Sequence, residues 1–478
     1  MNWNVTSPTL LSLSLEVGRG VYTLDDCRRM VRAKASLIED DLSAVFNPIS
    51  RKVDARAAFA VLDNSKALLA RRISLQRQWD ALGAPIPDMI VGLMSSDGDI
   101  DTYLQARPGV AACSLYLATD GRVWAVFARA ARWRRAIQYD VIGVVSGTAA
   151  AEFLREANQY LKSLVSGLPD FALQTSLLRT LGAAILPAIQ KLRIRGSLVL
   201  IPHRLLHLLP LHCMSADING RCTYLDQLVQ STSYAASLFQ SRSPRIVAGR
   251  AGFAHKPARV LAVFDTSAAD LKWIQPQVLY YRGLQRMGLP IDIVLDDRHL
   301  PSELSEYIWI SWGGHATSSP ADWGGSSLAF GRTKHRAIEI ALRWTCARRP
   351  WILLGACSSA VDTSEIQHVD EYCGLDLAFV MGGAWGVTAT MWPVADELAA
   401  FADTFLTDHV FFHRRDPAEA QAVMQRSLRT GTWKRLMSPA DSRHGEEIRA
   451  VVRELQRLPD DAFSSIRDWG VFRSYGAP

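Results

Sequence analysis

The sequence has few cysteines, and they lack the spacing of a disulfide framework. Seven are scattered over 478 residues without a Cys-x-x-Cys pair, at positions 27, 113, 213, 222, 346, 357 and 373. An odd, irregular set argues against a secreted disulfide scaffold and favours a reducing compartment. At least one thiol is therefore expected to be free.

Targeting segments are also absent. The first twenty residues show neither a basic stretch ahead of apolar residues nor a small-residue cleavage site, so a secretory signal is not expected. The uncharged stretch Leu377–Ala395 contains three glycines and Trp392-Pro393. We predict a buried helix followed by a buried strand there, not a membrane span. The sequence thus favours a cytoplasmic protein without membrane contact.

Nucleotide-binding motifs are missing as well. There is no Walker loop or dinucleotide fingerprint, so we predict no cofactor. The net charge is +6, and arginines cluster at positions 129, 132, 134 and 135, which raises the question of nucleic acid. No aromatic-interleaved RNA motif or helix-turn-helix accompanies this cluster, so a solvated face or an acidic partner is the favoured interpretation.

Residues 1–94 have a helical pattern. Apolar positions recur every three or four residues in Cys27–Phe46 and Ala55–Ala81. This region either binds a partner or covers one side of the following domain. Beyond it, Ala111–Ala118 and Arg122–Phe127 are rich in β-forming residues and are separated by Thr-Asp-Gly, which predicts a hairpin.

The rest of the chain alternates between helical and strand patterns. Helices are predicted at Ala149–Val165, Leu173–Leu192, Gln277–Met287, Lys334–Trp344, Leu375–Met381, Leu398–Phe412 and Pro417–Arg429. Strands are predicted at Ser197–Ile201, Val260–Phe264, Asp292–Leu295, Tyr307–Trp312, Trp351–Leu354 and Gly386–Met391. Short apolar strands between amphipathic helices predict an α/β fold, with a mostly parallel sheet flanked by helices on both faces. Functional sites in such folds lie at the carboxyl ends of strands.

Two segments place a reactive residue at such a strand end. IWISWGGHATS (308–318) leads to His315, and WILLGACSSA (351–360) leads to Cys357. If the strands are neighbours, the imidazole and the sulfur converge, as nucleophilic catalysis requires. An unassisted thiol is only a few per cent thiolate at neutral pH, and a nearby histidine corrects this. The alternative is a loop histidine and a small buried cysteine without chemistry.

Small residues surround both positions. Gly313, Gly314 and Ala356 let the backbone approach a substrate and permit tight turns. Gly314 is therefore a candidate substrate-binding residue. The backbone N–H groups of Ala316 and Cys357 are candidates for an oxyanion hole, which stabilises the charge that develops in acyl transfer.

Several ordered blocks accompany these two segments: LVLIPHRLLHLLPLHCM (198–214), LVQSTSYAAS (228–237), LLGACSS (353–359), WGVTATMWPVADE (385–397) and WGVFRSYG (469–476). Together they resemble the CHAT domain, a caspase-like peptidase module related to separase. The resemblance covers roughly residues 95–478. It implies the caspase–hemoglobinase fold, with an N-terminal pseudo-half (95–250) and a catalytic half (251–478), and a cysteine endopeptidase with a His315/Cys357 dyad. One departure is Ala316, where the family usually has glycine; alanine serves as well unless the loop needs a positive φ.

The resemblance to separase also assigns a role to Asp396. This residue falls where the family has the acidic residue of its primary specificity pocket, which implies cleavage after Arg or Lys. A carboxylate in such a pocket would pair with a substrate guanidinium. The alternative is that Asp396 caps the helix that starts near Glu397.

The resemblance further implies a protein substrate and a signal-activated protease, as in bacterial antiphage defence or cell-death signalling. A protein or ligand activator would then bind the N-terminal region. The alternative function is a catalytically silent scaffold or binding module that keeps the caspase-like fold.

A group of histidines after the predicted strand Ser197–Ile201 is a second candidate for chemistry. His203, His207, His212 and Cys213 lie close together in sequence, and histidines four residues apart can bind zinc. Leucine pairs and two prolines between them favour a core-facing turn segment instead. We therefore predict no metal site.

Overall fold

The structure is a computed structural model. It describes residues 46, 54–65, 97–130, 136–166, 169–238, 259–295, 300–301, 304, 306–317, 326–344, 346, 348–356, 374–437 and 445–476. Cys357 lies outside these residues, as do most of the predicted helical region 1–94 and three of the four clustered arginines.

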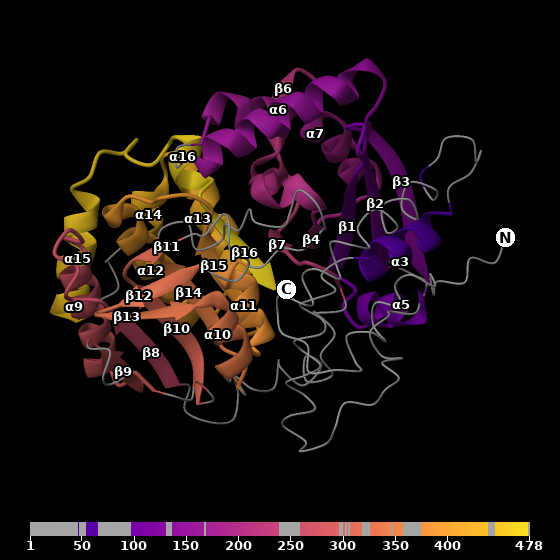
Figure 1. Ribbon diagram of the computed structural model, residues 1–478. Helices are drawn as coiled ribbons and strands as arrows, with labels where there is room; N and C mark the ends of the chain where they lie inside the picture. The colour runs from indigo at the N-terminus through magenta and orange to yellow at the C-terminus, as the bar shows by residue number, and fades with distance from the viewer. Residues whose placement is uncertain are drawn as a thin grey trace, which may run out of the picture.

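A large twisted sheet organises the described chain (Figure 1). Its eleven strands run in the order β3-β2-β1-β4-β7-β16-β15-β14-β10-β8-β9. Their bounds are β1 (Val110–Leu117), β2 (Val123–Ala130), β3 (Ile137–Val145), β4 (Ser197–Ile201), β7 (Ser231–Tyr234), β8 (Arg259–Phe264), β9 (Ile291–Val294), β10 (Tyr307–Gly313), β14 (Trp351–Gly355), β15 (Gly386–Thr390) and β16 (Phe472–Gly476). The predicted mostly parallel α/β sheet is confirmed.

The sheet changes direction at one place in its middle. Strand β16 is antiparallel to β15 but parallel to β7. On one side, β1, β4 and β7 run parallel to one another, and on the other side β8, β10, β14 and β15 do so. The carboxyl ends of these two sets therefore lie at opposite edges of the sheet.

Helices cover both faces of the sheet. They are α3 (Ala55–Ser65), α5 (Asp97–Gln105), α6 (Thr148–Val165), α7 (Phe171–Lys191), α9 (Ile274–Arg286), α10 (Ala337–Arg343), α11 (Leu375–Met381), α12 (Asp396–Phe411), α13 (Pro417–Arg429), α14 (Trp433–Leu436), α15 (Glu446–Gln456) and α16 (Ile466–Trp469). Strand β1 shows why helices must cover both faces, since it has apolar side chains on each. Its alternate residues Ala112 and Tyr116 pack into the cluster formed with α3 and α5, whereas Cys113 and Leu115 pack into the main core with α7.

Two of the helices begin at an aspartate that caps the helix N-terminus. The Asp416 side chain accepts the amide of Ala418, and Pro417 takes the first position of α13, where its missing N–H is not needed. In the same way, Asp170 accepts the amides of Ala172 and Leu173 at the start of α7.

Helix α7 has the length and apolar composition of a membrane-crossing segment. It is a core helix of this sheet, with Leu177, Leu181 and Ile185 fully buried. It packs so closely on β5 (Ser215–Ile218) that a Cβ on Gly182 would lie 2.3 Å from the Ser215 carbonyl oxygen. The stretch Leu377–Ala395 contains most of helix α11 and all of strand β15, so the predicted helix followed by a strand is confirmed.

One predicted element needs correction, and the edge strand β3 was not predicted. The predicted helix Lys334–Trp344 begins as strand β13 (Thr333–Arg336) and becomes helical only at α10. Strand β13 pairs with β12 (Ser327–Phe330), which pairs with β11 (Ala316–Thr317) in a small antiparallel sheet. The edge strand β3 was not predicted, because its partly exposed residues show no clear alternation. A further hairpin joins β5 to β6 (Arg221–Tyr224).

Candidate active site

Neighbouring parallel strands bring the predicted site residues to one edge of the sheet. Strands β8, β10, β14 and β15 lie side by side and point in the same direction. Their carboxyl ends are followed by Asp265, His315, Cys357 and Asp396, in that order across the sheet. Loops that leave adjacent parallel strands at the same edge enclose a crevice.

The register of β10 and β14 relates the two reactive positions. Gly313 pairs with Gly355, so His315 and Cys357 each stand two residues beyond a paired glycine on strands about 4.8 Å apart. The condition set by the sequence, that the two strands be neighbours, is met. Cys357 itself lies outside the described residues. The residue before it, Ala356, is buried, and its carbonyl accepts the hydroxyl of Thr390 at 2.6 Å.

His315 is half exposed on this edge, and its Nε2 lies 3.2 Å from Oδ1 of Asp270. Asp270 belongs to the segment between β8 and α9, and sequence reasoning missed it. No local pattern separated it from an ordinary loop aspartate. The hydrogen bond to His315 lowers the pKa of the Asp270 carboxyl below its ordinary value.

The backbone of Ala316 leaves its N–H outside the hydrogen bonds of the small antiparallel sheet. It pairs with Leu328 across β11 and β12, and the amide of Ala329 donates to the carbonyl of His315 at 2.9 Å. This is the pattern of a non-hydrogen-bonded antiparallel pair, so the N–H of Ala316 points away from β12. Ala316 is not among the described residues with positive φ, so alanine fits where the family usually has glycine.

Of the two glycines before His315, only Gly313 is required by packing, since a Cβ on Gly314 would make ordinary van der Waals contacts. A Cβ on Gly313 would lie 2.6 Å from the ring of Phe264, so the end of β10 tolerates no side chain there. A Cβ on Gly314 would lie 3.4 Å from both the Ala329 carbonyl oxygen and the Asp265 Cβ. Gly314 is buried directly before His315, and its contact with substrate stays a prediction.

Asp396 does not cap its own helix. Ala395 occupies the cap position of α12, and Asp396 is the first helical residue. Its Oδ2 accepts the amide of Trp273 at 2.7 Å, at the start of α9. Burial raises the pKa of Asp396, with the nearby carboxylates of Glu397 and Asp270 acting in the same direction, while the amide of Trp273 opposes the shift. A half-buried carboxylate of this kind is stabilised by a cation.

The histidines after β4 have separate structural contacts. Nδ1 of His203 accepts the amide of Leu117 at the end of β1. His212 contacts the Tyr234 hydroxyl at 2.9 Å and the Gly470 carbonyl oxygen at 3.2 Å. Burial lowers the pKa of His212 to about 3, so it is a neutral side chain of the core. These contacts support the core-facing interpretation of this segment.

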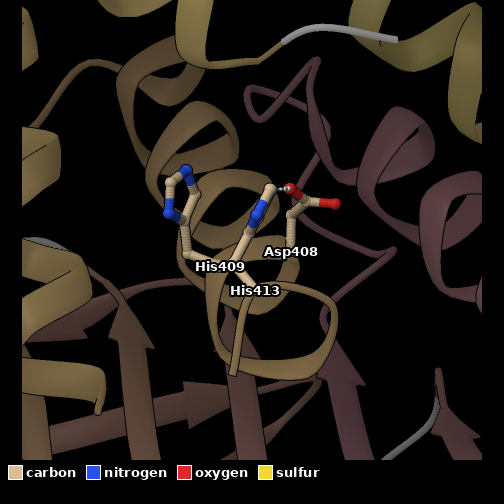
Figure 2. Close-up of side chains that lie close together, drawn as sticks. All are labelled: Asp408, His409 and His413. Atoms are coloured by element: carbon tan, nitrogen blue, oxygen red, sulfur yellow. Dashed lines mark ion pairs between the residues drawn. The ribbon is translucent and has the colours of Figure 1, made fainter. Parts of the chain in front are cut away.

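A different group of side chains could reach a metal ion. Asp408, His409 and His413 lie together at the end of α12, with ligand atoms within 4.8 Å of one another (Figure 2). His413 contacts Asp408 at 3.4 Å, and the rings of His409 and His413 lie 4.7 Å apart with an angle of 34° between their planes. Zinc bonds of about 2 Å need two imidazole nitrogens roughly 3.3 Å apart and aimed at one point. Two nearly face-to-face rings do not aim their nitrogens at one point. The positive charge of Arg415 also lowers the pKa of His409 and would repel a bound cation.

His409 instead has the contacts of a neutral aromatic ring. It is 3% exposed and stacks on Phe405, with ring centroids 4.0 Å apart. Burial lowers its pKa to about 3, helped by Arg415 and His413. Its ring nitrogens make no hydrogen bond of ordinary geometry among the described residues, although the carbonyl of Leu436 is close enough to oppose the pKa shift.

We therefore expect His409→Phe to make the protein more resistant to acid. The unfolded state binds a proton on His409 near its ordinary pKa of about 6.5, whereas the folded state does so only near 3, so stability is lost as pH falls between these values. Urea unfolding at pH 7 and pH 4.5 measures the difference, with His315→Ala, which removes a partly exposed histidine after β10, as the control. A zinc-dependent rise in the Tm of the unmutated chain that disappears in His409→Phe would contradict this account and indicate a metal site.

Comparisons with known proteins place the whole crevice within one matched region. Residues 171–477 match the family model of the CHAT domain. Among solved structures, the chain is similar to two crystal structures of the Saccharomyces cerevisiae separase–securin complex, with 11% and 10% sequence identity and TM-scores of 0.45 and 0.43. The matches cover 98% and 93% of this chain but only 40% and 37% of those chains. No curated protein matches the chain.

Proposed function

The chain belongs to the CHAT-domain family, and we propose that it is a cysteine endopeptidase in which Cys357 is the nucleophile and His315 the general base. The observation that carries this proposal is the register of β10 and β14, which sets both residues two positions beyond paired strand ends. The fixed carbonyl of Ala356 supports it, because the backbone directly before the nucleophile is held by Thr390.

In the proposed reaction, His315 takes the proton of the Cys357 thiol, and the thiolate attacks the carbonyl carbon of the scissile peptide. The imidazolium then gives its proton to the leaving amine, and a thioester remains on Cys357. Water attacks the thioester as His315 accepts its proton, which releases the acid product and restores the thiol.

The amides of Ala316 and Cys357 would hold the oxyanion of each tetrahedral intermediate. The N–H of Ala316 suits this role because the β11–β12 pairing does not use it. A backbone donor of this kind is already oriented before the reaction, so no reorganisation is needed as charge develops. Gly314 would let the substrate backbone approach beside it.

Asp396 would select a basic residue before the cut. Its Oδ2 accepts the amide of Trp273, the backbone of Lys272 also acts on the carboxylate, and a substrate guanidinium or ammonium would add the counter-charge that these neutral donors do not supply. Burial disfavours the ionised form of Asp396, and a bound cation would stabilise that ionised form.

The test is hydrolysis of fluorogenic peptides that carry Arg, Lys or citrulline before the scissile bond. Citrulline matches arginine in shape but has no charge, so we expect a preference for Arg of roughly 10²-fold. Asp396→Asn keeps an acceptor for Trp273 and removes the charge, so it should erase this preference and leave citrulline cleavage unchanged. If no peptide is cut and a thiol-reactive peptide probe does not label Cys357, the chain is a scaffold and the proposal is wrong.

We also propose that the natural substrate is a protein partner in the cytoplasm, and that the N-terminal region receives an activator. Family resemblance supports a setting in bacterial defence or cell-death signalling. One contact supports communication from the N-terminal region: buried Asp63 of α3 accepts the amide of Leu238, just after β7. An activator that moves α3 would therefore act directly on the sheet.

A further inference from the structure

The segment between β8 and α9 begins at the carboxyl end of β8 and is fastened at its start. Asp265 is buried directly after β8 and accepts the amide of Ser267 at 3.0 Å and the amide of Gly331 at 3.1 Å. Its own amide donates to the carbonyl of Gly313 at 3.0 Å. The beginning of the segment is thus tied to the end of β10 and to the β12–β13 turn.

The far end of the same segment is fastened by Asp396. The carboxylate of Asp396 holds the amide of Trp273, the residue that precedes α9. Two carboxylates, one directly after β8 and one at the start of α12, therefore fix the segment on both sides. A short loop that is held at both ends has little freedom to move the residues between them.

Asp270 lies in this fixed segment and reaches His315. Oδ1 of Asp270 is 3.2 Å from Nε2 of His315, across a separation of 45 residues in the chain. The Asp270 side chain is 71% exposed and the His315 side chain 40% exposed, so water screens the pair and its effect should be moderate.

We propose that Asp270 is a positioning residue whose carboxylate accepts a hydrogen bond from the N–H at Nε2 of His315. This contact leaves Nδ1 as the nitrogen that takes the thiol proton of Cys357. This inference rests on the proposed function. An ionised carboxylate can only accept a hydrogen bond, so Nε2 must carry hydrogen. A neutral imidazole then has its lone pair on Nδ1. An aspartate is ionised at neutral pH, and the hydrogen bond with His315 lowers the pKa of Asp270 further.

The same contact stabilises the imidazolium that forms when the thiol loses its proton. Other ionisable groups on the elements that meet here are Asp265 after β8, Lys272 in the same segment, and Asp396 and Glu397 at the start of α12. Replacing Asp270 alone leaves these side chains in place, although it also removes the upward effect of Asp270 on the pKa of Asp396. The difference between the two pH profiles therefore reports the loss of the Asp270 carboxylate.

The experiment measures the rate at which iodoacetamide alkylates Cys357 in the full chain as a function of pH. Mass spectrometry of the peptide that contains Cys357 makes the readout specific to this thiol and independent of any substrate. Asp270→Asn should slow alkylation at pH 7 about threefold and move the pH midpoint upward, since about half a pH unit in the imidazolium equilibrium gives that change and the pair is screened by water. Asp270→Glu should restore part of the rate, and the Tm should stay unchanged.

The matched control is Asp460→Asn, which removes another exposed carboxylate in a surface ion pair, with Lys434 at 2.7 Å. It should leave the profile unchanged. If Asp270→Asn gives the unmutated profile while His315→Ala slows alkylation, the role of Asp270 is wrong and the dyad stands. If His315→Ala also leaves alkylation unchanged, the proposed function fails, and the role of Asp270 fails with it.

Discussion

Cys357→Ala is expected to abolish peptide cleavage completely, because alanine supplies no nucleophile and a thioester cannot form. His315→Ala should lower the rate about 10²- to 10⁴-fold, the usual contribution of a general base. The residual rate of His315→Ala should rise with pH as the unassisted thiol ionises. Initial rates on the Arg peptide between pH 5.5 and pH 9 measure both effects.

Two cysteine replacements serve as controls for the loss of a thiol. Cys222→Ala removes an exposed thiol on β6, and Cys346→Ala removes a buried one near α10. Neither position lies on the strand ends that form the crevice, so both variants should cleave at nearly the unmutated rate. Cleavage that survives Cys357→Ala but is lost in either control would show that Cys357 is not the nucleophile.

Asp376→Ala is expected to destabilise the fold by about 3–5 kcal/mol, because it leaves a buried guanidinium without its counter-charge. Arg473 of β16 and Asp376 of α11 are both 0% exposed. Nε and Nη2 of Arg473 contact Oδ2 of Asp376 at 3.0 and 2.8 Å, and Nη1 donates to the carbonyl of His207 at 2.8 Å. One guanidinium thus joins α11, the segment after β4, and the strand at which the sheet changes direction.

Urea unfolding measures the effect, with Arg457→Ala as the control. Arg457 forms an exposed ion pair with Glu454 at 2.6 Å, so its loss should cost no more than about 1 kcal/mol. The double replacement Asp376→Leu with Arg473→Met should recover much of the stability, since apolar side chains of similar volume often replace a buried pair without loss. A loss below 1 kcal/mol in Asp376→Ala would mean that water or another residue compensates the charge.

Several parts of the fold could be predicted from local pattern. Strands β4, β8, β10 and β14 are apolar runs that end at Gly, Pro or a polar residue, and each was predicted to within one or two residues. Elements without such a pattern were missed. Strand β13 has the sequence Thr-Lys-His-Arg and is exposed or half exposed, so backbone pairing with β12 defines it, and its side chains carry no signal.

The sequence by itself identified the candidate residues for chemistry, because a reactive residue after an apolar strand and a small-residue turn is a local feature. His315 and Cys357 were identifiable in this way, whereas Asp396 was assigned through the resemblance to separase. Only the tertiary structure decided that β10 and β14 are neighbours in register and that β16 reverses the sheet. It also revealed Asp270 beside His315, and Asp396 on the amide of Trp273, across 45 and 123 residues. Such contacts depend on how all the helices pack on the sheet, so no local stretch of sequence encodes them.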